Sequence, residues 1–277
     1  MCSVLQSFCV MLVVVAALAG RCESKGVPLQ MNGKKGLPSR PLRAASFPEA
    51  GRPVTAQLGT CNPNTFSVSG ISAGACMAIQ FQYAWSSIVQ GAGLVAGVPY
   101  GCSGGSLSGA EECLNDPSVE SPQNLFLGAQ IAADAGLIDP LSNLKNQTVM
   151  LFSGLIDTVV PHQNMINVQT MLQMAGTERV TTYFNYSAEH AWITDKYGNS
   201  CATLGSPYIN NCGLDFGGNF LHALFSNLGL KWNASMSPLI AANMFSFDQT
   251  QFGASASISM GNTGYMYVPT VCQAAGS

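Results

Sequence analysis

A serine lies between two glycines at Gly70-Ile-Ser72-Ala-Gly74 in this chain of 277 residues. The segment follows a β-rich run, residues 66–69, and precedes an apolar helical pattern that begins near Ala75. A strand, a tight turn of small residues and a helix are the setting of a nucleophile elbow, which lifts the serine hydroxyl above the sheet. The backbone amide of Ala73 would then face a developing oxyanion. We expect Ser72 to be a nucleophile, and the alternative is a purely structural serine.

A second segment, Gly101-Cys-Ser103-Gly-Gly105, has the same glycine–serine spacing. In a chain with 29 glycines such a match carries little weight without its context. The residues that follow, Ser-Leu-Ser-Gly, do not have a helical pattern. We therefore expect a flexible surface turn here and do not assign Ser103 a catalytic role.

A serine hydroxyl needs a neighbouring base, and the chain contains three histidines. His222 lies in an apolar helical segment, where a packed or capped histidine is the usual case. His162 follows Pro161 in the first turn of an expected helix, and we expect it to line or cap that helix. His190 follows an expected strand, residues 180–186, in a loop of the kind that carries active-site residues in doubly wound sheets. His190 is the predicted base.

The acid that orients this base is predicted to be Asp157. It follows an expected strand, residues 148–153, and so lies in a loop at a carboxyl end, as His190 does. The resulting chain order of serine, aspartate and histidine is that of α/β-hydrolases. Glu189 and Asp195 are nearer to His190 in sequence, but we interpret them as solvated loop acids.

The elements that would position these residues alternate along the chain. The expected strands are residues 66–69, 93–98, 148–153 and 180–186, and the expected helices are residues 75–87, 121–135 and 161–175. Ser121 with Pro122 suits a helix start, and Gly136, Gly176 and Gly229 lie where helices should end. This alternation predicts an α/β protein with a mainly parallel sheet.

The composition, 47% hydrophobic and 9% charged, predicts one folded domain with a sizeable core. An apolar run, residues 10–18, ends in Ala17-Leu18-Ala19, which predicts a signal peptide over residues 1–20. The run is too short to span a bilayer, and we expect no membrane span. Residues 21–56 are rich in Gly, Pro and basic side chains, which indicates a linker or pro-segment. Residues 57–277 would form the domain.

The predicted domain is acidic. It carries four basic and twelve acidic side chains, a formal charge of −8. A negative charge repels the phosphate backbone, so we do not expect nucleic acid to be a partner.

The cysteines and sequons indicate secretion. Two pairs enclose short Gly-, Ser-, Asn- or Pro-containing loops, which is the setting of local disulfides in an oxidising compartment: Cys102 with Cys113, and Cys201 with Cys212. The spacings do not match a zinc site, and no metal is expected. The pairing of Cys61, Cys76 and Cys272 stays open. Sequons at Asn146, Asn185 and Asn233 are candidate glycosylation sites.

Four segments together resemble the secreted poly(3-hydroxybutyrate) depolymerases of fungi and bacteria. They are Ser69-Gly-Ile-Ser-Ala-Gly-Ala-Cys-Met-Ala78, Gly91-Ala-Gly-Leu-Val-Ala-Gly-Val-Pro-Tyr100, Ala188-Glu-His-Ala-Trp-Ile-Thr-Asp195 and Thr263-Gly-Tyr-Met-Tyr-Val-Pro269. The likeness runs from about Asn62 to Cys272.

The resemblance implies a circularly permuted α/β-hydrolase with helices on both faces of its sheet. It implies Ser72 as nucleophile, Asp157 as acid and His190 as base, without a cofactor, and it implies disulfides Cys102–Cys113 and Cys201–Cys212. The expected substrate is an ester or polyester. The short stretch between the linker and the Ser72 turn agrees with a permutation, because an ordinary hydrolase has several strands before its nucleophile.

The resemblance also implies further segments after the part that matches residues 265–272. In the family these are a strand ending in His-Gly-Cys, whose cysteine amide is the second oxyanion donor, and a tryptophan-bearing substrate region. The sequence ends at Ser277, so we expect C-terminal strands to be missing and the catalytic machinery to be incomplete.

Two other hypotheses stay open. One is an inactive or binding-only secreted protein with a hydrolase scaffold, and the other is an esterase for a different lipid, feruloyl or polyester substrate. Tyr100, Trp192 and Tyr208 are candidate substrate contacts, with core packing as the alternative. The sequence does not indicate an oligomeric state.

Overall fold

The computed structural model describes residues 13–16, 66–229, 240–252 and 261–267. The chain divides into two units. Residues 13–16 and 66–229 belong to the larger unit, and residues 240–252 and 261–267 belong to the smaller one. Cys61, Asn233 and Cys272 and the predicted linker, residues 21–56, lie outside the described residues.

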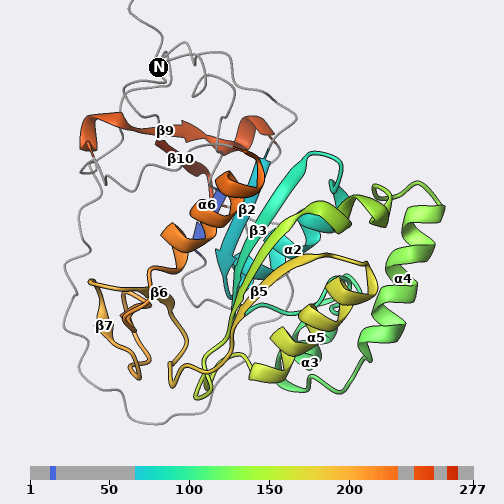
Figure 1. Ribbon diagram of the computed structural model, residues 1–277, viewed down its shortest axis with the longest axis horizontal. Coiled ribbons are helices and arrows are strands. Elements are labelled where there is room, and N and C mark those ends of the chain that lie inside the picture. Colours follow the sequence, from blue (N-terminus) through green and yellow to red (C-terminus); the bar gives the residue numbers. More distant parts are fainter. Residues whose placement is uncertain (1–12, 17–65, 230–239, 253–260, 268–277) are drawn as a thin grey trace, which may run out of the picture. The chain divides into compact units, whose positions relative to one another are not determined.

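The larger unit is built on a parallel sheet with the strand order β1-β2-β3-β4-β5 (Figure 1). The strands are β1 (Val13–Ala16), β2 (Phe66–Ile71), β3 (Val89–Val95), β4 (Thr148–Phe152) and β5 (Arg179–Tyr183). The α-helices are α2 (Ala73–Ala84), α3 (Leu107–Asn115), α4 (Pro122–Asp134), α5 (His162–Met174) and α6 (Phe216–Asn227), with a 3₁₀ helix η1 (Leu141–Asn146) before β4. The predicted α/β class is confirmed. None of the helices in the described ranges combines the length and apolar character needed to cross a bilayer.

Successive side chains of β4 enter two different cores, because side chains alternate across a strand. Val149 and Leu151 pack in a cluster with residues of α2 and α5, including Ile79 and Met165. Met150 and Phe152 pack in a second cluster with residues of α6, including Phe216 and Phe220. Helices therefore cover both faces of the sheet, as expected.

The helix boundaries follow the predicted signals. The Ser121 side chain accepts a hydrogen bond from the Asn124 amide at 3.1 Å and so caps the start of α4. Helices α4, α5 and α6 are each followed by a glycine with positive φ: Gly136 (69°), Gly176 (74°) and Gly229 (69°). This left-handed conformation ends a helix at little cost only when the residue lacks a Cβ.

The expectation of a flexible turn without a helix after Ser103 is wrong. Helix α3 starts at Leu107, and the Ser106 hydroxyl caps it by accepting from the Gly109 amide at 3.0 Å. Cys113, in the last turn, is fully buried and forms a disulfide with Cys102. The cap and the covalent anchor stabilise a helix that its Gly- and Ser-rich sequence does not indicate.

A small second sheet follows β5 and was not predicted. Its strands are β6 (Trp192–Thr194), β7 (Asn199–Ser200) and β8 (Ile209–Asn211), in the parallel order β6-β8-β7. The fully buried Asn210 donates to the backbone carbonyls of Cys201 (3.0 Å) and Thr203 (2.8 Å), and the disulfide Cys201–Cys212 closes the segment. Strands of two or three residues are too short to show periodicity in the sequence.

Strand β1 lies in the run predicted as a signal peptide. It pairs in parallel with β2, from Val13 opposite Val68 to Ala16 opposite Ile71. A run of valines has high β-propensity, and the edge of β2 offers unpaired backbone groups. The pairing does not test whether the segment is cleaved, so the signal peptide over residues 1–20 stays a prediction.

The smaller unit contains an antiparallel strand pair. Strand β9 (Met244–Asp248) pairs with β10 (Thr263–Tyr267), with Thr263 opposite Asp248. Two 3₁₀ helices, η2 (Ala241–Asn243) and η3 (Gln249–Phe252), flank β9. The Gln249 side chain donates to the carbonyls of Gly261 (3.0 Å) and Thr263 (3.1 Å) and so connects η3 to the start of β10.

Candidate active site

Ser72 occupies the turn between β2 and α2. Its backbone has φ 59° and ψ −128°, a conformation that costs about 1–3 kcal/mol for a residue with a Cβ. Serine is a preferred helix N-cap, yet the Ser72 side chain does not cap α2. The strained turn therefore presents a hydroxyl that the helix start does not use, which agrees with the predicted nucleophile elbow.

Gly70 allows this turn to be tight. A Cβ added at Gly70 would overlap the Gly74 carbonyl and would lie 2.8 Å from the backbone nitrogen of Ala75. The end of β2 and the first turn of α2 are thus in direct backbone contact. Any side chain at position 70 must push the two elements apart, which explains the small residues around Ser72.

The Ala73 amide belongs to the first residue of α2. The first four amides of a helix do not have intrahelical carbonyl partners, and the helix dipole places partial positive charge at this end. Ala73 follows Ser72 directly, so its amide is available near the serine. Its role as an oxyanion donor stays a prediction.

Asp157 and His190 lie in direct contact. Asp157 Oδ2 is 2.9 Å from His190 Nδ1, and the two side chains are 1% and 2% exposed. The other carboxylate oxygen, Oδ1, accepts from the amides of Val159 (2.9 Å) and Val160 (2.8 Å). A carboxylate can only accept, so Nδ1 donates and Nε2 is left as the basic nitrogen. The structure brings the predicted acid and the predicted base together.

Backbone hydrogen bonds join the strand ends that carry the three residues. Beyond the strands, the ladder continues with Ser72 N to Val95 O (3.0 Å), Ala96 N to Phe152 O (3.0 Å) and Ser153 N to Tyr183 O (3.4 Å). All these strands are parallel, so Ser72, Asp157 and His190 follow strand ends on the same edge of the sheet.

The loops after β4 and β5 are packed backbone against backbone. The Leu155 amide donates to the Tyr186 carbonyl at 2.8 Å. A Cβ added at Gly154 would overlap the carbonyl oxygen of Ala188. This close approach places the loop of Asp157 against the loop of His190. Gly154 was not predicted as part of the site.

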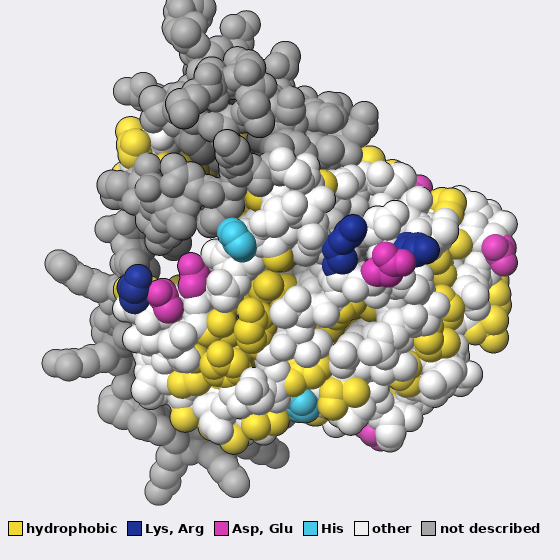
Figure 2. Space-filling view, in the orientation of Figure 1, with side chains coloured by type: hydrophobic (Ala, Val, Ile, Leu, Met, Phe, Trp, Pro, Cys, Tyr) yellow, Lys and Arg dark blue, Asp and Glu magenta, His cyan; other side chains and the backbone are white. Residues whose placement is uncertain are grey.

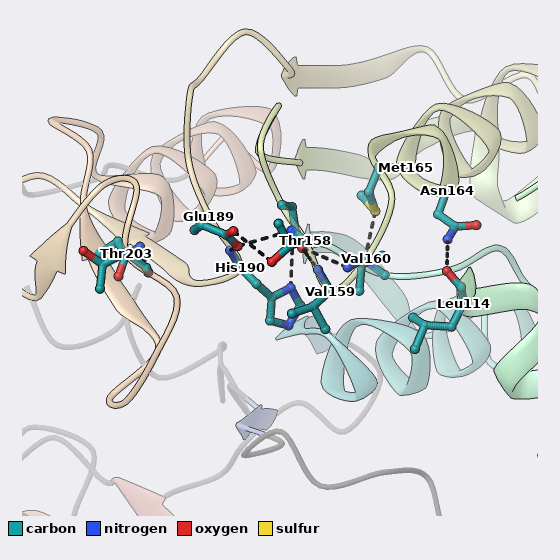
Figure 3. A network of polar contacts seen from close by, with 12 residues as sticks. Leu114, Thr158, Val159, Val160, Asn164, Met165, Glu189, His190 and Thr203 are labelled. Carbon is teal, nitrogen blue, oxygen red and sulfur yellow. Dashed lines mark hydrogen bonds and ion pairs between the residues drawn. The ribbon is translucent and has the colours of Figure 1, made fainter. Parts of the chain in front are cut away.

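Glu189 is a further polar residue of this region, and its interpretation as a solvated loop acid is wrong. It is only 8% exposed and accepts hydrogen bonds from Thr158 and from the His190 amide (Figure 3). Its neighbours Ala188 and Ala191 are buried, and these small apolar residues were the available sequence signal. Asp195 does fit the solvated interpretation, because it is 38% exposed and pairs with Lys196 at 3.2 Å.

The other two histidines lie in helices. His162 is the first residue of α5, and its ring contacts Phe184 edge to face at 5.1 Å. Burial lowers the pKa of His162, and the Ser153 backbone carbonyl opposes that effect in part. His222 is exposed in α6, so it is not packed in the core as expected.

The remaining candidates have structural settings. Both predicted disulfides, Cys102–Cys113 and Cys201–Cys212, are formed. Tyr100 stacks on Tyr83 at 4.7 Å, and Trp192 contacts Phe216 at 5.4 Å, which supports packing roles. Asn146 and Asn185 are exposed, as a glycan requires. Within the described ranges, His, Cys, Asp and Glu side chains do not cluster in threes that could hold a metal ion.

The parallel sheet, the helices on both faces and the strained serine after β2 define an α/β-hydrolase-type fold. The crystal structure of PHB depolymerase from Penicillium funiculosum matches with a TM-score of 0.65 and 29% identity, covering 76% of this chain and 64% of that chain. A structure of PHB depolymerase complexed with R3HB trimer matches equally well.

Two curated proteins are similar in sequence. They are a poly(3-hydroxybutyrate) depolymerase of Delftia acidovorans, 37% identical over 214 residues, and a polyhydroxybutyrate depolymerase of Talaromyces funiculosus, 32% identical over 222 residues. Each match covers 76% of this chain, which spans 42% and 61% of the two relatives. No family model matches. The chain is a homologue of poly(3-hydroxybutyrate) depolymerases, which confirms the predicted resemblance.

Proposed function

We propose that this protein is a secreted serine esterase that hydrolyses ester bonds of poly(3-hydroxybutyrate) or its oligomers. The observation that carries the proposal is the buried hydrogen bond between Asp157 and His190, formed at the sheet edge where Ser72 occupies a strained strand-to-helix turn. A nucleophile, a base and an acid that orients the base are the three groups that acyl transfer requires.

In the first half-reaction, Ser72 Oγ attacks the ester carbonyl while His190 Nε2 takes the hydroxyl proton. Asp157 holds the imidazole in the tautomer with Nδ1 protonated and stabilises the imidazolium that forms. The Ala73 amide donates to the oxyanion of the tetrahedral intermediate. His190 then gives its proton to the departing alkoxide, and the acyl group stays on Ser72.

In the second half-reaction, water replaces the alcohol. His190 takes a proton from the water, and the resulting hydroxide attacks the acyl-enzyme. The tetrahedral intermediate collapses as His190 returns the proton to Ser72 Oγ, and a carboxylic acid leaves. This chemistry uses side chains of the protein and does not need a cofactor.

Apolar surface beside the acid supports a polyester substrate. Leu155 and Ile156, which directly precede Asp157, are 52% and 43% exposed. In Figure 2 apolar side chains gather in several patches, and charged side chains are few on this face. Such a surface suits an apolar polymer better than a charged substrate.

Secretion is part of the same proposal. The disulfides Cys102–Cys113 and Cys201–Cys212 fit an oxidising compartment. The apolar run at residues 10–18 would be the signal, and Asn146 and Asn185 would carry glycans. Expression of the full chain in a secreting host, followed by N-terminal sequencing of the mature protein, tests the signal; a retained residue 1 in the medium would contradict it.

A fluorophosphonate probe tests the nucleophile. We expect it to label the purified protein at Ser72, and we expect Ser72→Ala to abolish the labelling. The matched control is Ser103→Ala, which removes the other serine of the same glycine–serine spacing and should leave labelling unchanged. Equal labelling of Ser72→Ala and the wild type would refute the assignment.

The competing candidate is a secreted protein that binds polyester without hydrolysing it. Hydrolysis of short-chain p-nitrophenyl esters or 3-hydroxybutyrate oligomers decides between the two, because activity that Ser72→Ala abolishes eliminates the binding-only function. Rates compared across oligomers, lipid esters and feruloyl esters then identify the substrate class.

A further inference from the structure

Glu189 receives hydrogen bonds from both loops of the acid–base pair. Its Oε1 accepts from the Thr158 hydroxyl at 2.9 Å. Its Oε2 accepts from the Thr158 amide at 3.2 Å and from the His190 amide at 2.9 Å. Figure 3 shows Glu189, Thr158 and His190 gathered at this point.

The residues in this contact are sequence neighbours of the predicted acid and base. Thr158 directly follows the acid, Asp157, and Glu189 directly precedes the base, His190. The hydrogen bonds of Glu189 therefore connect the residue after the acid to the residue before the base. Across the two loops they run alongside the hydrogen bond between Asp157 Oδ2 and His190 Nδ1.

The Glu189 carboxylate is buried, which costs free energy unless hydrogen bonds replace its lost hydration. Glu189 is 8% exposed. Each of its oxygens has at least one donor, and its own amide donates to the Cys201 carbonyl at 3.0 Å. Backbone and side chain of Glu189 are thus both fixed.

We propose that Glu189 is a positioning residue of the Asp157–His190 pair. It sets the separation and angle of the two loops, so that His190 Nδ1 stays in line with Asp157 Oδ2. The inference rests on the proposed esterase function for its kinetic consequence. Its structural part, the geometry of the acid–base hydrogen bond, does not depend on turnover.

Three variants separate positioning from charge. Glu189→Met keeps the chain length and removes both acceptors. Glu189→Gln keeps an acceptor for the two amides at the Oε2 position, and its NH₂ group can donate to the Thr158 hydroxyl, which also accepts. Glu178→Met is the matched control, because Glu178 is 56% exposed and forms a surface ion pair with Lys145.

We expect Glu189→Met to lower kcat for a soluble ester by about 10²-fold with KM unchanged, as a small misplacement of a catalytic group does. Glu189→Gln should restore kcat to within about tenfold of the wild type, because the hydrogen bonds that fix the loops persist. Glu178→Met should leave both constants unchanged. Three results would each overturn the inference: an unchanged kcat in Glu189→Met, a change in Glu189→Met that affects KM alone, or an equal fall in kcat in Glu189→Met and Glu189→Gln.

Thr158→Val gives a second route if Glu189→Met does not fold. It removes one donor to Glu189 and keeps the shape of the side chain. We expect kcat to fall by about 3–10-fold, the value of one hydrogen bond. In the Glu189→Gln background the same substitution leaves the Gln NH₂ group without its partner, so the two losses should not be additive. An unchanged kcat in Thr158→Val, or simple additivity, contradicts the inference.

Proton NMR measures the positioning directly. The Nδ1 proton of His190, shared with Asp157, should give a low-field signal that Asp157→Asn removes. We expect this signal to persist in Glu189→Gln and to broaden or vanish in folded Glu189→Met. If the wild-type protein does not hydrolyse esters, the proposed function is wrong, but the NMR comparison still tests the role of Glu189. Identical signals in the wild type, Glu189→Gln and Glu189→Met would contradict the inference.

Discussion

The nucleophile turn and the acid–base pair of the proposed site are held in place by different means. Ser72 is positioned by its local chain: β2 ends at Ile71, α2 begins at Ala73, and the backbone contact at Gly70 sets the distance between them. Asp157 and His190 come from loops 33 residues apart. Side-chain hydrogen bonds and the approach of Gly154 to Ala188 hold these two loops together.

This difference determines how each region can fail. Among the described residues, the Ser72 side chain does not cap the nucleophile turn, and the turn relies on close backbone contact. Adding a side-chain atom at Gly70 is therefore the way to disrupt it. The acid–base pair depends on polar side chains with few exposed atoms, so removing or neutralising an acceptor is the way to disrupt it. The following substitutions test this contrast.

The largest effect is expected from Asp157→Asn. An asparagine can present its NH₂ group to His190 and so favour the wrong tautomer, and we expect kcat to fall by about 10⁴-fold. Ester hydrolysis and the rate of fluorophosphonate labelling both measure this loss. Asp195→Asn is the control, because Asp195 is paired with Lys196 at the surface, and its kcat should not change. A similar fall in kcat in both variants would mean that the loss of one negative charge, and not the loss of the Asp157–His190 hydrogen bond, is responsible.

Gly70→Ala should disrupt the nucleophile turn. Its Cβ would overlap the Gly74 carbonyl, so the turn must shift, and we expect about 1–3 kcal/mol lower free energy of unfolding. Labelling of Ser72 should slow by about 10²-fold. Gly128→Ala is the matched control, since nothing lies within 4 Å of its added Cβ in α4. That change should raise the free energy of unfolding by about 0.4–1 kcal/mol. Unchanged labelling in Gly70→Ala would show that the backbone contact does not position the serine.

The smallest effect concerns His162, whose neighbour Ser153 begins the acid loop. Its pKa in the folded state is lowered from 6.5 by burial. As pH falls below 6.5, the unfolded chain therefore binds a proton before the folded protein does, and stability decreases with falling pH. His162→Phe removes this proton uptake and keeps an aromatic ring beside Phe184.

We expect the melting temperature of His162→Phe to fall less than that of the wild type between pH 7.5 and pH 5. Thermal unfolding followed by circular dichroism at several pH values measures the difference. Parallel curves for the two proteins would contradict a lowered pKa at His162. Because both proteins are compared with themselves across pH, a uniform change in stability does not affect the result.

Local signals in the sequence predicted much of the fold and part of the site. Serine and glycine at helix ends act through their own hydrogen bonds and backbone angles, so Ser121, Gly136 and Gly176 could be interpreted from the sequence. The strand–turn–helix pattern around Ser72 is local in the same way. Asp157 and His190 could be nominated because carboxyl ends of parallel strands share an edge.

Contacts between segments distant in sequence could not be predicted from such local signals. Helix α3 depends on a disulfide and a cap within a segment of poor helical propensity, and β6, β7 and β8 are too short to have a periodicity. A glutamate is usually exposed, so the burial of Glu189 could not be predicted from its residue type. Its burial depends on where Thr158 lies in the folded chain.

The sequence by itself determined the chemistry that is available: a serine in a turn of small residues, with an aspartate and a histidine after later strands. Only the tertiary structure decided which carboxylate contacts His190. The side chains of two acids, Asp157 and Glu189, are both buried beside it, and their oxygens accept from different donors. The physical reason is that hydrogen-bond geometry depends on how loops distant in sequence pack, which residue type and spacing do not specify.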